Sequence, residues 1–162
     1  MIFKSIFIFL IFFCIGQNVL AQQTFLWSDT TFQIGSSRII NLRYDLDGPC
    51  SVAPCYDFME NRLIYDTLVT FLKDHPKLKI EISSHLDLGK KMTSNDDWSQ
   101  LKADSTKAIL VSKGINPEQI VAVGYGNKRQ IVSEEEIEKI EIKSQWIARY
   151  QNTRIEIIIK EF

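Results

Sequence analysis

The sequence has no surplus of basic residues, because 19 Lys and Arg are balanced by 20 Asp and Glu, giving a formal net charge of −1 at pH 7. Nucleic-acid-binding proteins usually carry a basic surplus, so no nucleic-acid partner is expected. Histidine is scarce too, with only His75 and His85. No metal-ligand cluster and no G-x-S-x-G setting around Ser83 or Ser84 is present. We therefore predict no metal, no cofactor and no catalytic residue.

Cysteine is equally rare, and one of the three, Cys14, lies in an apolar N-terminal stretch. The other two, Cys50 and Cys55, can form a disulfide in an oxidising compartment. The loop that they close is short, so the expected stabilisation is about 2 kcal/mol. A zinc site is disfavoured, because two sulfurs without a second pair of ligands do not complete a tetrahedron.

The sequence also lacks an apolar run of the length that crosses a membrane. Residues 6–15 are apolar, whereas a transmembrane helix needs about 20 residues. Lys4 precedes this run and residues 19–21 (VLA) fit a signal-peptidase site, which predicts a signal peptide over residues 1–21. An uncleaved anchor is the alternative, and a lipid anchor on Cys14 is disfavoured by the bulky Phe13 before it. We expect an exported mature chain.

Hydrophobic periodicity divides the rest of the chain into alternating strands and helices. Strands are predicted at residues 39–44, 78–83, 119–126 and 154–162, and helices at 57–75, about 97–114 and 133–152. Residues 22–38 are a short leader that either adds a strand or acts as a tether. The order βαβαβαβ predicts an α/β (α+β sandwich) domain over residues 39–162, with one mixed four-stranded sheet and helices packed against one face. The alternation of apolar and polar residues in these strands agrees with helices on one face only, because strands that are buried on both faces consist of continuous apolar runs.

The buried faces follow from the same periodicities. In the second strand Leu78, Ile80 and Ile82 alternate with polar residues, which predicts one buried and one solvent-facing side. Helical spacing marks the apolar faces of the first helix (Ile64, Leu68, Phe71, Leu72) and of the second (Trp98, Leu101, Ser105, Ala108, Ile109). The third helix opens on SEEE at residues 133–136, which has the form of a capping box. The last strand is predicted to bury Ile155, Ile157 and Ile159.

Four motifs follow one another along the chain: SHLD at 84–87, NDDWSQLKA at 95–103, QIVAVGYG at 119–126 and NTRIE at 152–156. In that order they resemble G-H-T-D, N-x-x-L-S-x-x-R-A, I-x-x-x-G-Y-G and N-R-R-V-E of the OmpA-like family of peptidoglycan-binding domains. The resemblance extends over residues 39–162. The chain is a divergent member, because Ser84, Leu86, Trp98, Lys102 and Thr153 replace the family's Gly, Thr, Leu, Arg and Arg.

The resemblance implies a site for the diaminopimelate of the peptidoglycan stem peptide, formed by Asp87, Asn95 and Lys102 and bordered by Arg154. Asp87 is expected to hold the ligand's ammonium and Lys102 its carboxylate, while Asn95 supports a hydrogen bond; such charge-assisted bonds are stronger than neutral ones. Arginine binds a carboxylate through a planar fork, whereas lysine is a point charge. We expect Lys102 to hold the carboxylate less well, by about 1 kcal/mol.

Each of these residues also has a simpler interpretation. Asp87 can be a loop residue facing water, Lys102 an exposed helix lysine, and Asn95 a helix or turn cap. Arg154 can charge the solvent-facing side of the last strand. For the whole protein, the alternative is a binding-deficient OmpA-like fold that serves as a structural module with an envelope or outer-membrane protein. Both interpretations place the product in the periplasm or on the periplasmic side of the outer membrane.

Overall fold

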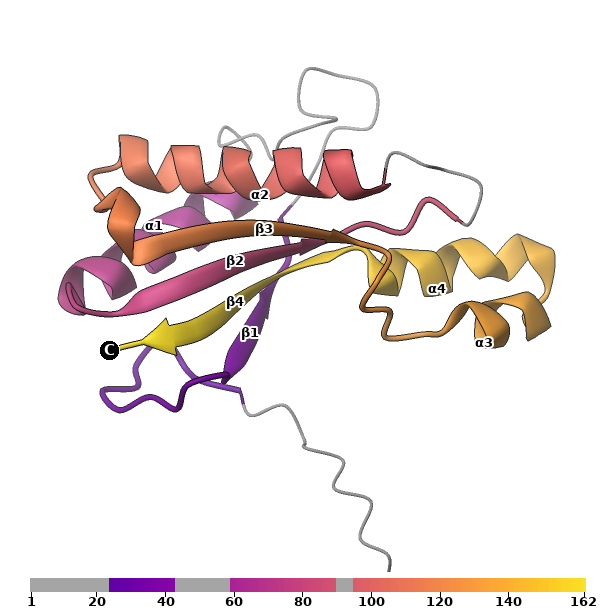
Figure 1. The fold of residues 1–162 in the computed structure, drawn as a ribbon, viewed down its shortest axis with the longest axis horizontal. Coiled ribbons are helices and arrows are strands. Elements are labelled where there is room, and N and C mark those ends of the chain that lie inside the picture. The colour runs from indigo at the N-terminus through magenta and orange to yellow at the C-terminus, as the bar shows by residue number, and fades with distance from the viewer. Residues whose placement is uncertain (1–23, 43–58, 90–94) are drawn as a thin grey trace, which may run out of the picture.

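A computed structural model describes residues 24–42, 59–89 and 95–162. The predicted signal peptide, both cysteines of the predicted disulfide and Asp57, the expected cap of the first helix, lie outside these residues. Figure 1 shows the elements in order: β1 (Ser37–Ile40), α1 (Met59–Asp74), β2 (Lys79–His85), α2 (Asn95–Ser112), η1 (Pro117–Gln119), β3 (Ile120–Gly126), α3 (Glu134–Lys139), η2 (Ile142–Ser144), α4 (Gln145–Asn152) and β4 (Arg154–Glu161). Here η denotes a single short 3-10 turn.

The four strands form one mixed sheet in the order β1-β4-β2-β3. Strands β2 and β3 are parallel, and β4 runs antiparallel to both β1 and β2. Helices α1 and α2 share one hydrophobic core with the sheet, whereas α3 and α4 lie beyond the carboxyl ends of β2 and β3 (Figure 1). The predicted α+β fold, with a mixed four-stranded sheet and helices against one face, is confirmed.

Most of the predicted apolar faces form this core. Ile155, Ile157 and Ile159 of β4 are buried, as the alternation predicted. In α1, Leu68, Phe71 and Leu72 are buried and Ile64 is half-buried, so the predicted face of the first helix is confirmed. The described part of the leader packs on α1: Phe25 is buried and stacks on Phe71 with ring centroids 5.6 Å apart.

Strand β2 departs from the prediction of one buried and one solvent-facing side. Glu81 and Ser83 are 5% and 0% exposed, although they point away from the core. The Glu81 carboxylate accepts hydrogen bonds from Ser83 Oγ at 2.6 Å and Tyr125 Oη at 2.8 Å, and Lys160 Nζ lies 2.9 Å away. Neighbouring strands therefore supply the polar partners that permit burial of this second face.

Most of the predicted apolar face of α2 is wrong, although Ile109 is half-buried and packs against the core. Trp98 and Leu101 are 39% and 46% exposed. The buried side of the helix is mostly polar and consists of Asn95, Ser99, Lys102, Ala103, Thr106 and Leu110. Hydrophobic spacing therefore did not identify the docking face of this helix.

The reason is that α2 packs along β3, an edge strand whose outward backbone groups need hydrogen-bond partners. Gln100 accepts from Gly124 N at 2.8 Å and donates to Ala122 O at 3.2 Å. Lys107 Nζ donates to Ile120 O at 2.7 Å. Gln100 and Lys107 are half-buried, and the buried Ser99 accepts from Gly126 N at 2.8 Å. Side chains of α2 thus replace the missing neighbouring strand, and this requires polar residues where the helix meets the strand.

The helix predicted over residues 133–152 is broken. Its capping box at Ser133 is confirmed, but Ile140 adopts an extended conformation and ends α3. A continuous helix would place Glu134 and Arg149 about 22 Å apart along its axis. Instead the chain folds back through η2, and Arg149 Nη2 lies 2.6 Å from Glu134 Oε1. The break creates the contact that organises the candidate site.

Candidate ligand-binding site

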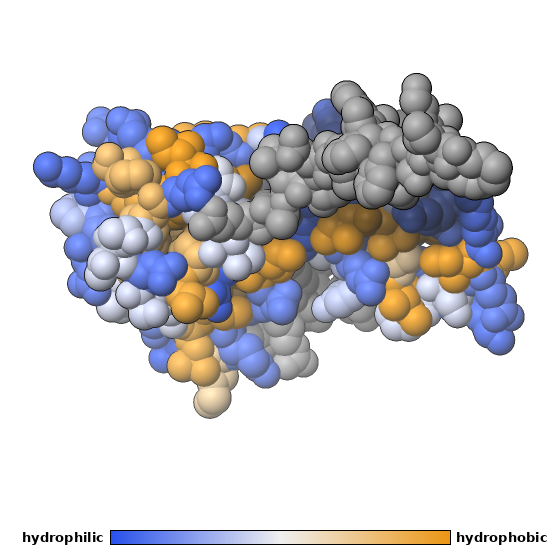
Figure 2. All heavy atoms as spheres, turned by 90° about the horizontal axis from the view of Figure 1, so that it is seen from below, coloured by the Kyte–Doolittle hydropathy of each residue, from blue (hydrophilic) through white to orange (hydrophobic). Residues whose placement is uncertain are grey.

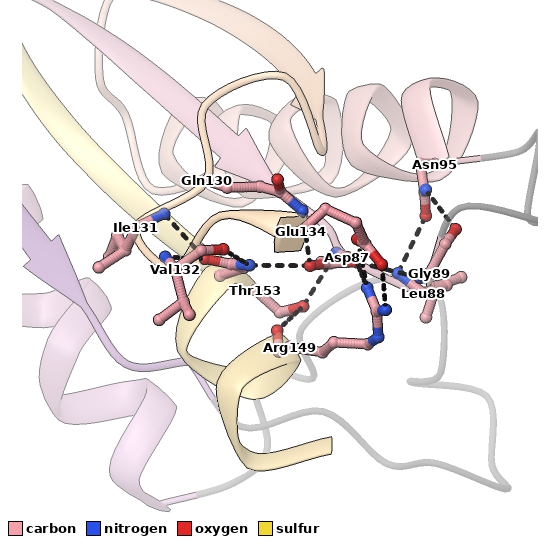
Figure 3. Close-up of polar contacts among 11 residues, drawn as sticks. Asp87, Leu88, Gly89, Asn95, Gln130, Ile131, Val132, Glu134, Arg149 and Thr153 are labelled. Carbon is pink, nitrogen blue, oxygen red and sulfur yellow. Dashed lines mark hydrogen bonds and ion pairs between the residues drawn. The ribbon is translucent and has the colours of Figure 1, made fainter. Parts of the chain in front are cut away.

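Asp87 lies two residues beyond the end of β2, and its carboxylate is the centre of a hydrogen-bond network (Figure 3). Oδ1 accepts from Gly89 N at 3.0 Å and from Arg149 Nη1 at 2.8 Å. Oδ2 accepts from Gln130 Nε2 at 3.1 Å and from Asn152 Nδ2 at 2.8 Å. The side chain is 0% exposed. The interpretation of Asp87 as a loop residue facing water is therefore wrong.

These donors determine the charge of Asp87. Burial by itself raises the pKa of a carboxyl group, but hydrogen bonds from Asn152, Gly89, Arg149 and Gln130 outweigh it and hold the pKa of Asp87 below its usual value. The carboxylate is therefore ionised at neutral pH. Because its folded-state pKa is lowered, its contribution to stability is present at neutral pH and is lost as the pH falls through that pKa.

The cation that contacts Asp87 is Arg149, a residue that the sequence did not single out. It lies in α4, 62 positions from Asp87 in the chain. Its guanidinium also forms a two-bond pair with Glu134, with Nη1 3.0 Å from Oε2 and Nη2 2.6 Å from Oε1 (Figure 3). This pairing raises the pKa of Arg149 and lowers that of Glu134. One signal was available, since Arg149 and Asn152 are three apart and share a helix face.

Asn152 attaches the chain before α3 to Asp87. Its Oδ1 accepts from the backbone N of Ile131 at 2.8 Å and of Val132 at 2.9 Å. Its Nδ2 donates to Asp87 Oδ2 and, at 2.9 Å, to Val132 O. Both donors and both acceptor positions of the amide are thereby used, in a side chain whose residue is 2% exposed.

Asn95, the first residue of α2, binds the backbone of the loop just after Asp87. Its Oδ1 accepts from Leu88 N at 3.2 Å, and its Nδ2 donates to Gly89 O at 3.5 Å. The predicted residues Asp87 and Asn95 are therefore brought together through the loop that connects them. Gly89 has a positive φ of 93°, which favours glycine at this turn.

Lys102 lies on the same buried face of α2, about 10 Å along the helix axis from Asn95. It is 8% exposed, so the interpretation of Lys102 as an exposed helix lysine is wrong. Burial lowers the pKa of Lys102 to about 8. The amine is thus still largely protonated at neutral pH and loses its charge under mildly alkaline conditions.

Arg154, the first residue of β4, is held by its own surroundings. Its side chain is 9% exposed, and Nε donates to Glu156 Oε1 at 2.6 Å, while Nη1 and Nη2 donate to the carbonyls of Asn152 and Arg129. It therefore does not charge a solvent-facing side of the strand. The guanidinium anchors the segment next to Asn152, at the border of the network around Asp87.

His85, which precedes this loop, is buried and stacks on Tyr125 with ring centroids 5.3 Å apart. Neither ring nitrogen has a hydrogen-bond partner in the described part of the chain. Burial lowers the pKa of His85 to about 4, so the ring is neutral at pH 7. Within residues 24–42, 59–89 and 95–162 there is also no group of three or more His, Cys, Asp or Glu side chains that could hold a metal ion.

Comparison with known proteins defines the class to which this fold and site belong. The profile of the OmpA family matches residues 60–143, more than half of the chain, including Asp87, Asn95 and Lys102. The chain belongs to the OmpA family. Three of the four motifs lie within this match, and the fourth, NTRIE at 152–156, lies beyond it.

Two curated relatives are similar over part of their length. Outer membrane porin F of Pseudomonas fluorescens is 29% identical over 92 residues, which are 57% of this chain and 26% of that protein. The peptidoglycan-associated lipoprotein of Buchnera aphidicola is 38% identical over 64 residues, 40% of this chain and 37% of that protein. This chain therefore corresponds to well under half of either relative.

Solved structures confirm the fold. The periplasmic domain of MotB from Helicobacter pylori superposes with a TM-score of 0.59 at 18% identity, over 81% of this chain and 86% of that one. The peptidoglycan-associated lipoprotein of Burkholderia pseudomallei gives a TM-score of 0.54, also at 18% identity, over 76% and 89% of the two chains. In the described residues of this protein, none of the helices has the length and hydropathy needed to span a membrane.

Proposed function

We propose that this protein is a non-catalytic, exported component of the cell envelope that binds peptidoglycan through the diaminopimelate-containing stem peptide. The observation that carries the proposal is the family match, because it spans the strand, loop and helix that hold Asp87, Asn95 and Lys102. Two relatives are peptidoglycan-associated by name. Others are named as outer-membrane or periplasmic proteins, which supports a location in the periplasm or at the outer membrane.

The chemistry of the site suits a ligand with both charges. The free end of diaminopimelate carries an ammonium and a carboxylate on one carbon atom. An ionised acid at the end of β2 and a buried amine on α2 provide opposite charges for these groups, in surroundings where charge-assisted hydrogen bonds are strong. In this proposal Asp87 acts on the ammonium side and Lys102 on the carboxylate side. Asn95 fixes the loop, and Arg154 anchors the border of the site.

The proposal excludes catalysis. His85 is the histidine nearest to Asp87 in the sequence, but it is buried, neutral and stacked on Tyr125. A general base must reach the proton that it takes, directly or through one water. If cell wall were turned over by the wild type and this turnover were abolished in His85→Ala, the protein would instead be a hydrolase.

A second candidate function, a structural module that docks on an envelope protein, is favoured by one surface. Ile142, Trp146 and Tyr150, from η2 and α4, are 85%, 65% and 73% exposed. Figure 2 shows apolar side chains interspersed with charged ones over the α3–α4 part of the molecule. Tryptophan and tyrosine are frequent in protein–protein interfaces. Co-purification with an envelope partner, in the absence of any wall binding, would establish this function instead.

The decisive test is sedimentation of the mature protein with purified peptidoglycan sacculi. The wild type is expected to sediment and to be released by free diaminopimelate. Asp87→Ala is expected to bind at least about tenfold more weakly, because the loop loses its central charge. The matched control is Asp74→Ala, the same change at an exposed position at the end of α1. Circular dichroism shows whether Asp87→Ala remains folded at the temperature of the assay. Unchanged binding by folded Asp87→Ala would refute the assignment of the site.

The lowered pKa of Lys102 predicts a pH dependence. The amine is cationic below its pKa of about 8, so wild-type binding is expected to fall as the pH rises from about 7 to about 9. Arginine stays protonated throughout this range, so Lys102→Arg is expected to remove the alkaline fall. It is also expected to bind about fivefold more tightly at neutral pH, which corresponds to the loss of about 1 kcal/mol assigned to lysine.

The measurement is a pH series of sacculus binding by both proteins in one buffer system. A wild type whose binding does not change over this range would contradict the role of Lys102. The role of Lys102 would also be contradicted if binding by Lys102→Arg fell with rising pH as much as binding by the wild type does. The group that titrates would then be a residue other than Lys102.

A further inference from the structure

The ligand loop, residues 86–89, begins directly after His85, the last residue of β2. Its first amide, that of Leu86, donates to Gly126 O at 3.0 Å and attaches the loop to the end of β3. The register of β2 against β3 shifts just before this bond. A register shift disrupts the strand ladder locally, so the loop can separate here while the rest of the sheet stays paired. Whatever holds His85 in place therefore also holds the start of the ligand loop.

The imidazole of His85 is buried without a hydrogen bond. The residue is 2% exposed, and neither Nδ1 nor Nε2 has a partner within the described residues. A neutral imidazole has one donor and one acceptor, and burial of such groups without partners is unfavourable. The ring stacks on Tyr125, with the two ring planes 13° apart, and the Tyr125 hydroxyl donates to Glu81. Packing and stacking, rather than hydrogen bonds, therefore hold His85.

The surroundings of His85 oppose a proton on the ring. Burial is the main cause that lowers its pKa, and the cations Arg154 of β4 and Arg129 of the segment after β3 lower it further. Glu156 of β4 and Glu81 of β2 act in the opposite direction. Both acids already have partners: Glu156 accepts from Arg154 Nε at 2.6 Å, and Glu81 accepts the hydrogen bonds on the second face of β2. The ring is therefore held in its neutral form.

A protonated His85 would have to leave this position. Imidazolium has two donors and a positive charge, and the ring nitrogens have no acceptor among the described residues. Movement of the ring breaks the stack on Tyr125 and disturbs Arg154, whose Nη1 donates to Asn152 O at 3.0 Å. Asn152 in turn donates to Asp87 Oδ2 at 2.8 Å. Protonation thus acts on the ligand loop both at the end of β2 and through Asn152.

We propose that His85 positions the ligand loop as a neutral ring, and that protonation of this ring opens the loop and weakens peptidoglycan binding. This inference rests on the proposed function and leaves the roles of Asp87 and Lys102 unchanged. It adds a positioning residue that contacts no ligand and an acid-sensitive step at the point where the loop leaves the sheet.

The pH range of this step follows from the groups involved. A histidine released into water takes up a proton near pH 6.5, whereas burial keeps His85 neutral down to a pKa of about 4. Because the pKa of this base is lowered in the closed loop, its contribution to closure is complete above pH 6.5 and is lost as the pH falls toward 4. From pH 7 to pH 5 the ratio of open to closed loop is expected to rise about twentyfold. Asp87, whose pKa is lowered, and Lys102, whose pKa is about 8, keep their charges in this range.

Hydrogen exchange of the Leu86 amide measures this opening. After correction for the intrinsic exchange rate, its protection in the wild type is expected to fall about twentyfold from pH 7 to pH 5. His85→Phe keeps a ring that can stack on Tyr125 but cannot take up a proton, so its protection is expected to be nearly the same at both pH values. If His85→Phe does not fold, His85→Gln is the second variant without a titrating group. The matched control is His75→Gln, the same change at the other histidine, and it should retain the wild-type pH dependence.

Sacculus binding at the same two pH values tests the link to the ligand. The apparent affinity falls with the fraction of protein in the closed form, and the wild type is expected to bind at least about threefold more weakly at pH 5 than at pH 7. Each variant is compared only with itself at the other pH. His85→Phe and His85→Gln are expected to show no such fall, whereas His75→Gln should show it. Titration of the sacculi themselves would affect all four proteins equally.

The outcomes distinguish this inference from the function on which it rests. If folded wild type does not bind sacculi at pH 7, the proposed function itself fails. If the wild type binds, but its binding and its Leu86 protection are the same at pH 5 as at pH 7, peptidoglycan binding stands and the role of His85 is wrong. The same holds if both His85 variants show the wild-type fall. A role in packing alone would give a wild type without this pH dependence and variants that bind more weakly by one factor at both pH values.

Discussion

Gly124→Ala is expected to lower the free energy of unfolding by about 3 kcal/mol, an effect at the upper end of those caused by overpacking. A Cβ at this position of β3 would lie 2.7 Å from the carbonyl carbon of Ser99 and would overlap the backbone nitrogen and Cα of Gln100. Backbone atoms cannot rotate away as a side chain does. Helix α2 would have to move off the edge strand, which would break the Gln100 hydrogen bonds to Gly124 and Ala122.

Chemical unfolding of wild type and variant measures this effect. Val121→Thr is the control, because it lies on the same strand, is 49% exposed in the wild type and keeps a branched Cβ. It is expected to change the free energy of unfolding by less than about 0.5 kcal/mol. Equal stability of Gly124→Ala and the wild type would show that α2 does not pack directly on the backbone of β3.

Asn152→Ala is expected to have a comparable effect, about 4 kcal/mol, because it removes four hydrogen bonds in a buried position. It leaves the amides of Ile131 and Val132 and the carbonyl of Val132 without their partner, and it removes one of the four donors to Asp87. An unpaired buried polar group loses its hydration without compensation. The segment before α3 is therefore expected to detach from the C-terminal end of α4.

Hydrogen exchange is the most direct measurement, since the amide protons of Ile131 and Val132 should lose their protection in Asn152→Ala. Asn41→Ala, at an exposed position after β1, is the matched control and should leave exchange and stability nearly unchanged. If the two amides stayed protected in Asn152→Ala, the amide of Asn152 would not be what holds this segment. Binding to sacculi should also fall in Asn152→Ala, because Arg149 and Asp87 lose a fixed neighbour.

The contrast between α1 and α2 shows where sequence periodicity succeeds. In α1 the helical spacing of Leu68, Phe71 and Leu72 identified the buried face, because that face packs on apolar side chains of the sheet. Helix α2 has the same kind of spacing, yet Trp98 and Leu101 are exposed. Its partner is the backbone of an edge strand, which selects polar side chains, and no local pattern reveals that an edge will be placed there.

The residues of the candidate site likewise fall into two groups, those that the sequence motifs identified and those that only the tertiary structure revealed. The motifs located the loop of Asp87 and the helix that carries Lys102, because spacing along a strand and a helix is a local property. They did not show that this helix begins at Asn95 or that Lys102 is buried. They did not find Arg149, whose contact with Asp87 spans 62 positions and depends on a break in a helix that charge and periodicity predicted to be continuous. Extended backbone at Ile140 occurs without glycine or proline, so the sequence contains no strong signal for it.

By itself, the sequence determined the order of the four strands and of the first two helices, the apolar sides of α1 and β4, the membership of the family and the loop on which a ligand site is to be sought. These features depend on residues near one another in the chain or on motifs of constant spacing. Only the tertiary structure decided which cation neutralises Asp87, which side of α2 is buried and how the second face of β2 is satisfied. Those outcomes depend on which distant segments meet, and the partners of a buried polar group follow from the path of the whole chain.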